Sequence, residues 1–412
     1  MKKGKCAWNM RNFTKKNNSN NDSIENAFIK ILFTIASILI VLSVLKYDKL
    51  ISSIFYVSFF ITLAFWIYKL FINRLSVIDY LSFIIIILSI LNVFINSSLT
   101  SVTLSFNYIK KVIMFATCIM FLDTMTKINL NSCTKEYILC VNFFVSIVMI
   151  ILYFANGNTM YMFNGRVTKY LSFSFSNPNT AGLYLFSIAI YLLLFLKYYQ
   201  NFILKLISLI VFLFFTYFIY KTGSRNALFA ILIVIISLIA ISFKHKNKNI
   251  KIPNILKLFV VVWPIIFVFL YLKIVDSPFI KETFSFLISE GKNLDSRENM
   301  WLFALNNYYK SPIFGAYAQI SNDSGLSQMH NSHLDVLCSY GIIPFIILLF
   351  YLYLIIIKID NGNIQNSKEN VLSLISFMSF IFLGVGEAML FSGGLGFYIL
   401  CGTIIGFSQK SL

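Results

Sequence analysis

The chain has 412 residues, of which 58% are hydrophobic and only 12% are charged. Apolar runs near twenty residues long recur along it, so it carries more apolar surface than a soluble fold of this size could bury. These properties exclude an ordinary soluble domain and indicate a polytopic membrane protein. The formal net charge of +18 reflects mostly the placement of Lys and Arg around a membrane, and we predict no nucleic-acid binding.

The first 26 residues are polar and rich in Lys and Asn, without the apolar core and cleavage site of a secretory signal. We predict a cytoplasmic tail over residues 1–26 and a single transmembrane domain over residues 27–412. The six cysteines show no metal-ligand spacing and lie in the tail, inside predicted spans or in an inner loop. Neither a disulfide nor a metal site is therefore predicted.

Twelve apolar runs are long enough to cross a bilayer. They cover about residues 27–45, 51–72, 80–98, 109–125, 137–155, 179–197, 202–220, 226–243, 256–275, 333–357, 371–388 and 393–408. An even number of spans puts both termini on one side. Inner segments then hold about 21 Lys and Arg against about 12 outside, which favours a cytoplasmic N-terminus and C-terminus. The predicted fold class is all-α, a polytopic transmembrane helical bundle of about twelve spans, N-in and C-in.

The fourth run is the weakest candidate for a span, because Lys110 and Lys111 lie at its start. The next distinctive feature is an outer segment before the sixth span, where Arg166 is followed by Asn177-Pro178-Asn179. Pro178 suits a first helical turn, Asn177 can cap it, and the exposed amides there favour an anion. A plain capped helix entry explains the Asn-Pro-Asn triplet equally well but leaves Arg166 unexplained.

A second outer segment is the tight turn Gly223-Ser224-Arg225 between spans seven and eight. Gly223 permits close approach of the backbone, and Ser224 can cap the following helix. Arg225 then lies in the first helical turn, where a cation opposes the helix dipole unless an anion is present. The alternative is an arginine that only anchors the helix at the membrane interface.

The connection between spans nine and ten, about residues 276–332, is the one long loop. Asp295 and Glu298 fit a helix-capping arrangement, and Ser311–Pro312 would end the helix. The helix would carry an apolar stripe of Trp301, Leu305 and Tyr308. We therefore predict a large outer loop with short helices.

Arg297 lies in the first turn of this loop helix. It could pair with Asp295 or Glu298, an arrangement that contributes little at a surface. It is nevertheless the third outer arginine beside a helix start, after Arg166 and Arg225. Three separated arginines that converge on one cavity would suit a pyrophosphate.

The fourth outer segment runs from Met329 to Asp335 at the start of span ten. His330 can act there as a general acid or base, although a capping or interfacial role is the alternative. The spacing of His330 and His333 suggests a metal ion, but no third ligand is evident. Glu387, near the end of span eleven, is a further ionisable group inside the membrane region.

Together these segments resemble the O-antigen polymerase and O-antigen ligase superfamily of bacterial membrane glycosyltransferases. The resemblance covers roughly residues 160–345, and the layout of spans extends it over most of the chain. It rests on Gly165-Arg166 with Asn177-Pro178-Asn179, the Gly223-Ser224-Arg225 turn, the Arg297 helix leading to Pro312-x-x-Gly315, and His330-Asn331 followed by Gly341-Ile342-Ile343.

The resemblance implies metal-independent glycosyl transfer, without a cofactor, on the outer face of the cytoplasmic membrane. The donor sugar would be carried on undecaprenyl pyrophosphate. Arg166, Arg225 and Arg297 would hold and neutralise the pyrophosphate leaving group. His330 would orient or deprotonate the acceptor hydroxyl. Asp335, Glu298, Glu387 and His333 remain candidates for the base, and the other predicted substrate-binding residues are Asn179, Asn331 and Asp335.

We favour a polymerase of Wzy type that joins repeat units into O-antigen, capsular or exopolysaccharide chains. Polymerases of the family are diverse, and the heavy use of Lys, Asn and Ile suggests an AT-rich genome of an organism without lipid A. The first alternative is a ligase that transfers the glycan to a final acceptor. A transporter of lipid-linked oligosaccharide is the second, although the distinctive charges lie on one face and no repeat is visible. Expected partners are the lipid-linked oligosaccharide, membrane lipids, and the flippase and chain-length regulator of the same pathway.

Overall fold

The computed structural model describes residues 23–42, 48–73, 75–100, 106–155, 161–163, 166–169, 178–243, 252–275, 294–316, 329–362, 368–386 and 395–408. The first helix covers Ser23–Leu42. The later helices are α2 (Asp48–Ile72), α3 (Val77–Thr100), α4 (Phe106–Met125), α5 (Ser132–Ala155), α6 (Pro178–Tyr198), α7 (Phe202–Thr222), α8 (Arg225–Phe243), α9 (Asn254–Val275), α12 (Leu294–Lys310), α14 (Ser332–Tyr340), α15 (Ile342–Gly362), α16 (Lys368–Leu383) and α18 (Leu395–Phe407).

Among the described residues, seven helices are long and apolar enough to cross a membrane, and four further apolar helices are shorter. α4 falls in neither group, in keeping with the two lysines at its start. The prediction of a helical membrane protein is confirmed. The count of about twelve spans and the N-in, C-in orientation stay predictions.

One element was not predicted from the sequence. Tyr161–Phe163 forms strand β1, and Arg166–Lys169 forms strand β2. The two pair antiparallel, with Phe163 opposite Arg166 and an irregularity between Tyr161 and Met162. Strands of three and four residues are too short for an alternating pattern to stand out from a loop. Within the part of the chain that the structure describes, the regular elements are thus helices apart from this small hairpin in the connection between α5 and α6.

The first helix begins shortly before residue 27, where the tail was predicted to end, while the boundary between tail and membrane domain stays a prediction. The first helix begins at Ser23, and Glu25 and Asn26 are buried within the bundle. Glu25 Oε1 lies 2.5 Å from Nζ of Lys69, and Asn26 Oδ1 accepts from the backbone N–H of Asn131 at 3.1 Å. Polar residues can be buried once partners are supplied. Residues 1–22 of the predicted tail lie outside the described residues.

The helix predicted in the long outer loop is confirmed as α12. It ends at Lys310, directly before Ser311-Pro312. Its predicted apolar stripe is buried, and the indole Nε1 of Trp301 donates to the carbonyl of Met329 at 2.8 Å. Asp295 lies inside the helix rather than before it. Residues 276–293 and 317–328 of this loop lie outside the described residues.

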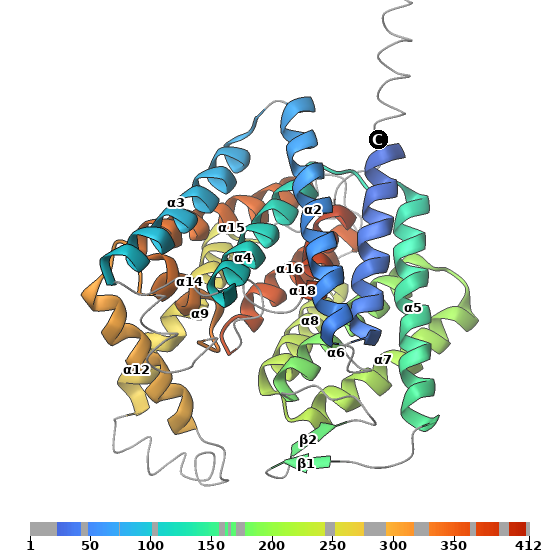
Figure 1. Cartoon of the computed structure of the whole chain (residues 1–412). Coiled ribbons are helices and arrows are strands. Elements are labelled where there is room, and N and C mark those ends of the chain that lie inside the picture. Colours follow the sequence, from blue (N-terminus) through green and yellow to red (C-terminus); the bar gives the residue numbers. More distant parts are fainter. Residues whose placement is uncertain are drawn as a thin grey trace, which may run out of the picture.

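Figure 1 places the β1–β2 hairpin and α12 at the same, lower end of the bundle. β2 packs against α6 and α7, and α12 packs against α14. The connection between α2 and α3 lies at the opposite, upper end (Figure 1). α16 is central, because it packs against α6, α8, α9, α15 and α18. Residues that contact the end of α16 are therefore linked, through α16, to most of the helices of the bundle.

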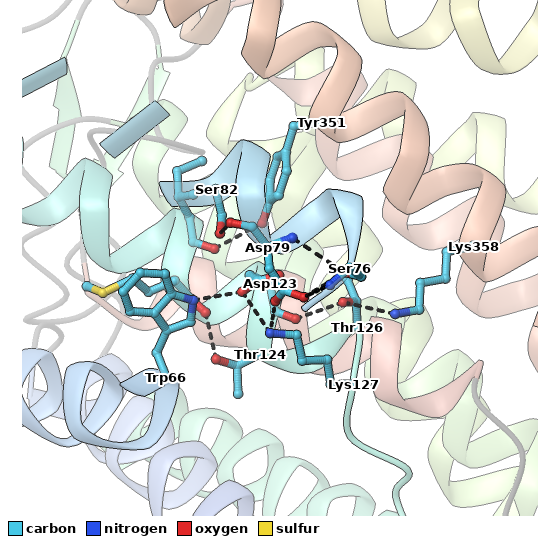
Figure 2. Close-up of polar contacts among 12 residues, drawn as sticks. Trp66, Ser76, Asp79, Ser82, Asp123, Thr124, Thr126, Lys127, Tyr351 and Lys358 are labelled. Carbon is cyan, nitrogen blue, oxygen red and sulfur yellow. Dashed lines mark hydrogen bonds and ion pairs between the residues drawn. The ribbon is translucent and has the colours of Figure 1, made fainter. Parts of the chain in front are cut away.

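Buried charges tie α2, α3 and α4 together near the α2–α3 connection (Figure 2). Trp66 Nε1 donates to Oδ2 of Asp123 at 2.7 Å. Lys127 Nζ lies 3.2 Å from the same oxygen and also pairs with Asp79. Asp79 in turn accepts from the N–H and hydroxyl of Ser76 at 2.6 and 2.7 Å, which closes the start of α3.

Lys358 of α15 extends this group by donating to the hydroxyl of Thr126 at 3.3 Å. We call Trp66, Asp79, Asp123, Lys127 and Lys358 the Asp–Lys network. Because each buried carboxylate in it has a cation or hydrogen-bond donor, the network joins four helices without an uncompensated charge.

Candidate functional site at the end of α16

α16 ends in a compact turn formed by Gly384, Val385 and Gly386. The three backbone N–H groups bond to the carbonyls of Ile381, Phe382 and Leu383 at 3.0, 3.1 and 3.4 Å. Asn226 of α8 and the start of α14 contact this turn, and Gly182 of α6 lies against Ser224 just before α8. We call the assembly the α16 junction, and it consists of Gly182, Ser224, Asn226, Asn331, Ser332 and Gly384–Gly386.

The α8 side of the junction contains the predicted arginine turn. Gly223 has φ 62, in the left-handed region, and its N–H bonds to the carbonyl of Tyr220 at 3.0 Å. Arg225 is the first residue of α8 and its side chain is exposed. The predicted glycine turn and the place of Arg225 in the first helical turn are both confirmed.

The residue after Arg225 joins α8 to α16. A Cβ atom on Gly386 would overlap the side-chain amide of Asn226, so a larger residue there requires the Asn226 side chain to move. Because Asn226 is packed against the end of α16, the start of α8 is fixed there. The exposed side chain of Arg225 therefore extends from a helix start that is packed against α16.

The α6 side brings in the Asn-Pro-Asn segment. α6 begins at Pro178, as the sequence predicts, so Asn179 lies in its first turn. One turn further, a Cβ atom on Gly182 would overlap Ser224. This close approach puts the start of α6 beside the arginine turn. The side chain of Asn179 and the whole of Asn177 lie outside what the structure describes.

Asn331 is the point where α14 meets the junction. Its Oδ1 accepts from the N–H groups of His333 and Leu334 at 3.0 and 2.8 Å, which caps α14. Its Nδ2 donates to the carbonyls of Pro264 in α9 and Val385 at 2.8 and 2.9 Å. Two donors and two acceptor positions are the full capacity of an amide. Asn331 therefore holds α14 against α9 and α16 and leaves no free group for a substrate.

The backbone of α14 adds a second link, since the N–H of Ser332 donates to the carbonyl of Gly384 at 2.8 Å. A Cβ atom on Gly384 would also press on the Ser332 side chain at 3.1 Å. The helix start and the α16 turn are thus in direct contact. This contact helps to fix the position of the backbone at His330, the residue just before Asn331.

His330 is half-buried and has φ 48. A left-handed conformation costs a residue with a side chain about 1–2 kcal/mol. It persists here because both neighbours are fixed: the carbonyl of Met329 binds Trp301, and Asn331 is held as described above. Strained backbone of this kind is concentrated at functional sites. The backbone of His330 is consequently held between contacts to α9, α12 and α16.

His333 and Asp335 occupy different surroundings from His330. The His333 ring is fully buried, and its centroid lies 6.2 Å from that of Phe345 in an edge-on contact. The Asp335 carboxylate is buried too, and its Oδ1 accepts from Nζ of Lys111 at 2.8 Å. Of the two histidines, His330 is the one that reaches the edge of the bundle. The proposed substrate and base roles of Asp335 stay predictions.

The remaining predicted residues are placed by their backbones. Arg166 is the first residue of β2, and Arg297 lies in the first turn of α12. Both elements lie at the lower end of the bundle in Figure 1. The side chains of Arg166, Arg297 and Glu298 lie outside what the structure describes, as does the whole of Glu387. Convergence of the three guanidinium groups therefore stays a prediction.

The two glycine motifs after Arg297 form one backbone crossing. Gly315 and Gly341 have φ 76 and 87, and a Cβ atom on Gly341 would overlap the carbonyl of Ile313. Across the crossing, the N–H of Ala316 donates to the carbonyl of Cys338 at 2.7 Å. Two side-chain amides of α3 also bind this crossing. Asn92 donates to the carbonyls of Ile313 and Tyr340, and Asn96 donates to the carbonyl of Gly315. This crossing fixes the far end of α14.

Sequence reasoning missed the turn on which the site is built. The Gly-x-Gly pattern of Gly384–Gly386 at the end of span eleven was the available signal, since paired glycines mark close backbone approach. Asn226 was equally visible beside Arg225. Neither signal identifies its partner, and the partners are what create the junction.

Residues 209–349 match the O-antigen ligase family. The predicted resemblance to the O-antigen polymerase and ligase superfamily is confirmed. The matched part contains the Arg225 turn, α12 and the His330–Asn331 start of α14, whereas the Arg166 hairpin and the α16 turn lie beyond it. Among proteins of curated function, none matches the chain. The match supports a glycosyltransferase class and offers nothing in favour of the transporter alternative.

Proposed function

We propose that this chain is a membrane glycosyltransferase that joins undecaprenyl-pyrophosphate-linked oligosaccharide repeat units into O-antigen, capsular or exopolysaccharide chains. The observation that carries the proposal is the α16 junction. It fixes the first turn of α8, with the exposed Arg225, and the start of α14, with the half-buried His330, against one helix end. The family match over the same segments supports this reading.

In the proposed reaction, the acceptor hydroxyl oxygen forms a bond to the anomeric carbon of the donor sugar. The bond from that carbon to the pyrophosphate oxygen breaks, and its electron pair leaves with undecaprenyl pyrophosphate. His330 takes the hydroxyl proton. Arg225, together with Arg166 and Arg297, stabilises the negative charge that develops on the leaving group. Fixed arginines can supply this stabilisation without a divalent ion.

Asn331 receives a different role from the one its sequence position suggested. Because both ends of its amide are engaged within the protein, we assign it to holding His330 in place. Asn179 keeps its proposed role at the helix start that faces the arginine turn. We place the reaction on the outer face of the cytoplasmic membrane, with a flippase supplying the donor and a chain-length regulator acting on the product.

Transfer of a finished glycan to a final acceptor is the second candidate, and it is favoured by the family that residues 209–349 match. Both reactions use the same donor and the same leaving group. They differ only in the acceptor hydroxyl, which belongs to another lipid-linked repeat unit in the first case and to a different molecule in the second.

The test is the polysaccharide made by a deletion strain complemented with wild type, Arg225→Ala, Arg297→Ala or His330→Ala, at matched membrane levels. Lys310→Ala, which removes an exposed cation at the end of α12, is the control and should behave as wild type. Single repeat units in the three variants support polymerisation at this site. Long chains that stay on the lipid carrier support the ligase instead, and full-length product on the final acceptor in all variants overturns both.

A further inference from the structure

Lys111 of α4 is a charged residue inside the bundle that the proposed chemistry does not use. It is 7% exposed, and its partner Asp335 is 2% exposed. Nζ of Lys111 lies 2.8 Å from Oδ1 of Asp335. Removing two charges from water is costly, and an apolar pair of similar volume is often as stable or more so. Helix packing alone therefore does not account for an ion pair at this position.

The pair lies one helical turn from the candidate general base. The N–H of Asp335 bonds to the carbonyl of Asn331 at 2.9 Å, which is the first helical hydrogen bond of α14. His330 directly precedes Asn331. With nine residues, α14 has little more than two turns, so any rotation at Asp335 also moves its start.

Other contacts hold the two ends of α14. Asn331 binds α9 and α16 at the start of the helix, and the backbone crossing holds its end. On the α4 side, Phe115 stacks on Tyr340 at 4.8 Å between ring centroids. Stacked rings can slide, whereas a buried hydrogen-bonded ion pair specifies one geometry. The Lys111–Asp335 pair is therefore a directional contact between α4 and α14.

We propose that Lys111 is a positioning residue for glycosyl transfer: acting through Asp335, it fixes the rotation of α14 and so the direction of the His330 imidazole. It also neutralises a carboxylate that would otherwise lie one turn from a site that binds an anion. This inference rests on the proposed function. In this inference the Asp335 carboxylate pairs with Lys111 inside the protein and does not bind the substrate.

The decisive variant is the double substitution Lys111→Met/Asp335→Leu, which removes both charges and leaves no buried ion unpaired. We expect this protein to fold to at least the wild-type level, because apolar replacement of a buried pair is tolerated. Its kcat for transfer from a purified lipid-linked repeat unit should fall about 10- to 100-fold, since small misplacements of a catalytic group have effects of this size. KM for the donor should stay within about twofold of wild type, because no substrate contact is removed.

A charge-reversed pair, Lys111→Asp/Asp335→Lys, should recover part of the lost kcat because the directional contact is restored. The matched control is Lys257→Met/Asp360→Leu. This pair joins α9 to α15 with 2.5 Å between Nζ and Oδ2 and is as buried as the first. It lies outside the α16 junction, so its loss should leave kcat per folded molecule unchanged. Folded protein is quantified by fluorescence-detected gel filtration.

Three results would overturn the inference: wild-type kcat in Lys111→Met/Asp335→Leu, an equal fall of kcat in the Lys257 control, or a raised KM with unchanged kcat. The last would mean that the pair touches substrate. Failure of the proposed function has a different signature, because Arg225→Ala would then retain full transfer activity whatever the Lys111 variants do.

Discussion

The Asp–Lys network and the α16 junction both join four or more elements, but they do so with opposite chemistry. The network uses two carboxylates and two lysines. The junction uses glycines, backbone carbonyls and the neutral amides of Asn226 and Asn331. Two ionisable side chains at the edge of the junction have contact with solvent, the exposed Arg225 and the half-buried His330.

This difference indicates what each region is built for. Buried charges that neutralise each other hold helices together and leave little net charge for a ligand. A neutral, tightly packed junction also holds its helices, and it leaves the exposed guanidinium of Arg225 available to an anionic substrate. Substitutions in the network should therefore change the amount of folded protein, whereas substitutions at the edge of the junction should change turnover.

The largest effect is expected for Lys127→Met. This change leaves the buried carboxylates of Asp79 and Asp123 without their shared cation, which should destabilise the fold by about 3–5 kcal/mol. Thermal unfolding of the detergent-solubilised protein and its level in membranes measure the loss. Lys197→Met, at an exposed lysine near the end of α6, is the control. Normal stability in Lys127→Met would show that the network does not hold the helices.

Asn331→Ala comes next, because it removes the helix cap and both cross-links of α14. Loss of four hydrogen bonds at a buried position should cost about 2–4 kcal/mol. Unlike Lys127→Met, it should also lower kcat in the protein that remains folded, since His330 loses one of its two fixed neighbours. A selective rise in KM with normal stability would instead indicate that the amide binds substrate.

Gly386→Ala tests the steric core of the junction. The added Cβ overlaps the amide of Asn226, and overpacking of this kind costs about 1–3 kcal/mol. The double variant Gly386→Ala/Asn226→Ala removes the overlapping atoms and should recover stability. A single variant as stable as wild type would contradict the close packing of α8 against α16.

The smallest effect is expected for Arg225→Lys, which keeps the charge and loses the planar fork. A bidentate contact to a phosphoryl group cannot be reproduced by an ammonium, so transfer should slow about tenfold, or about 1.4 kcal/mol. Thermal stability should be unchanged because the side chain is exposed. Equal activity of the two residues would mean that Arg225 acts only as a general positive charge or as an anchor.

Much of this molecule follows from its sequence. Hydropathy predicts the helices and the membrane class, and α12 has the apolar stripe and the end that its sequence indicates. The Arg225 turn and the start of α6 at Pro178 are also predicted. These features depend on residues within a few positions of one another, where periodicity, capping and turn preferences act.

What only the tertiary structure decided is which of these local features meet. Asn331 binds Val385, 54 positions away, and Lys111 binds Asp335 across 224 positions. The sequence marks Lys111 only as a weakness in a predicted span and Gly386 only as part of a Gly-x-Gly pattern. Neither the role of the buried charge nor the need for a glycine is apparent until its partner is known. Partners are chosen by the packing of whole helices, and that choice turns separate motifs into one site.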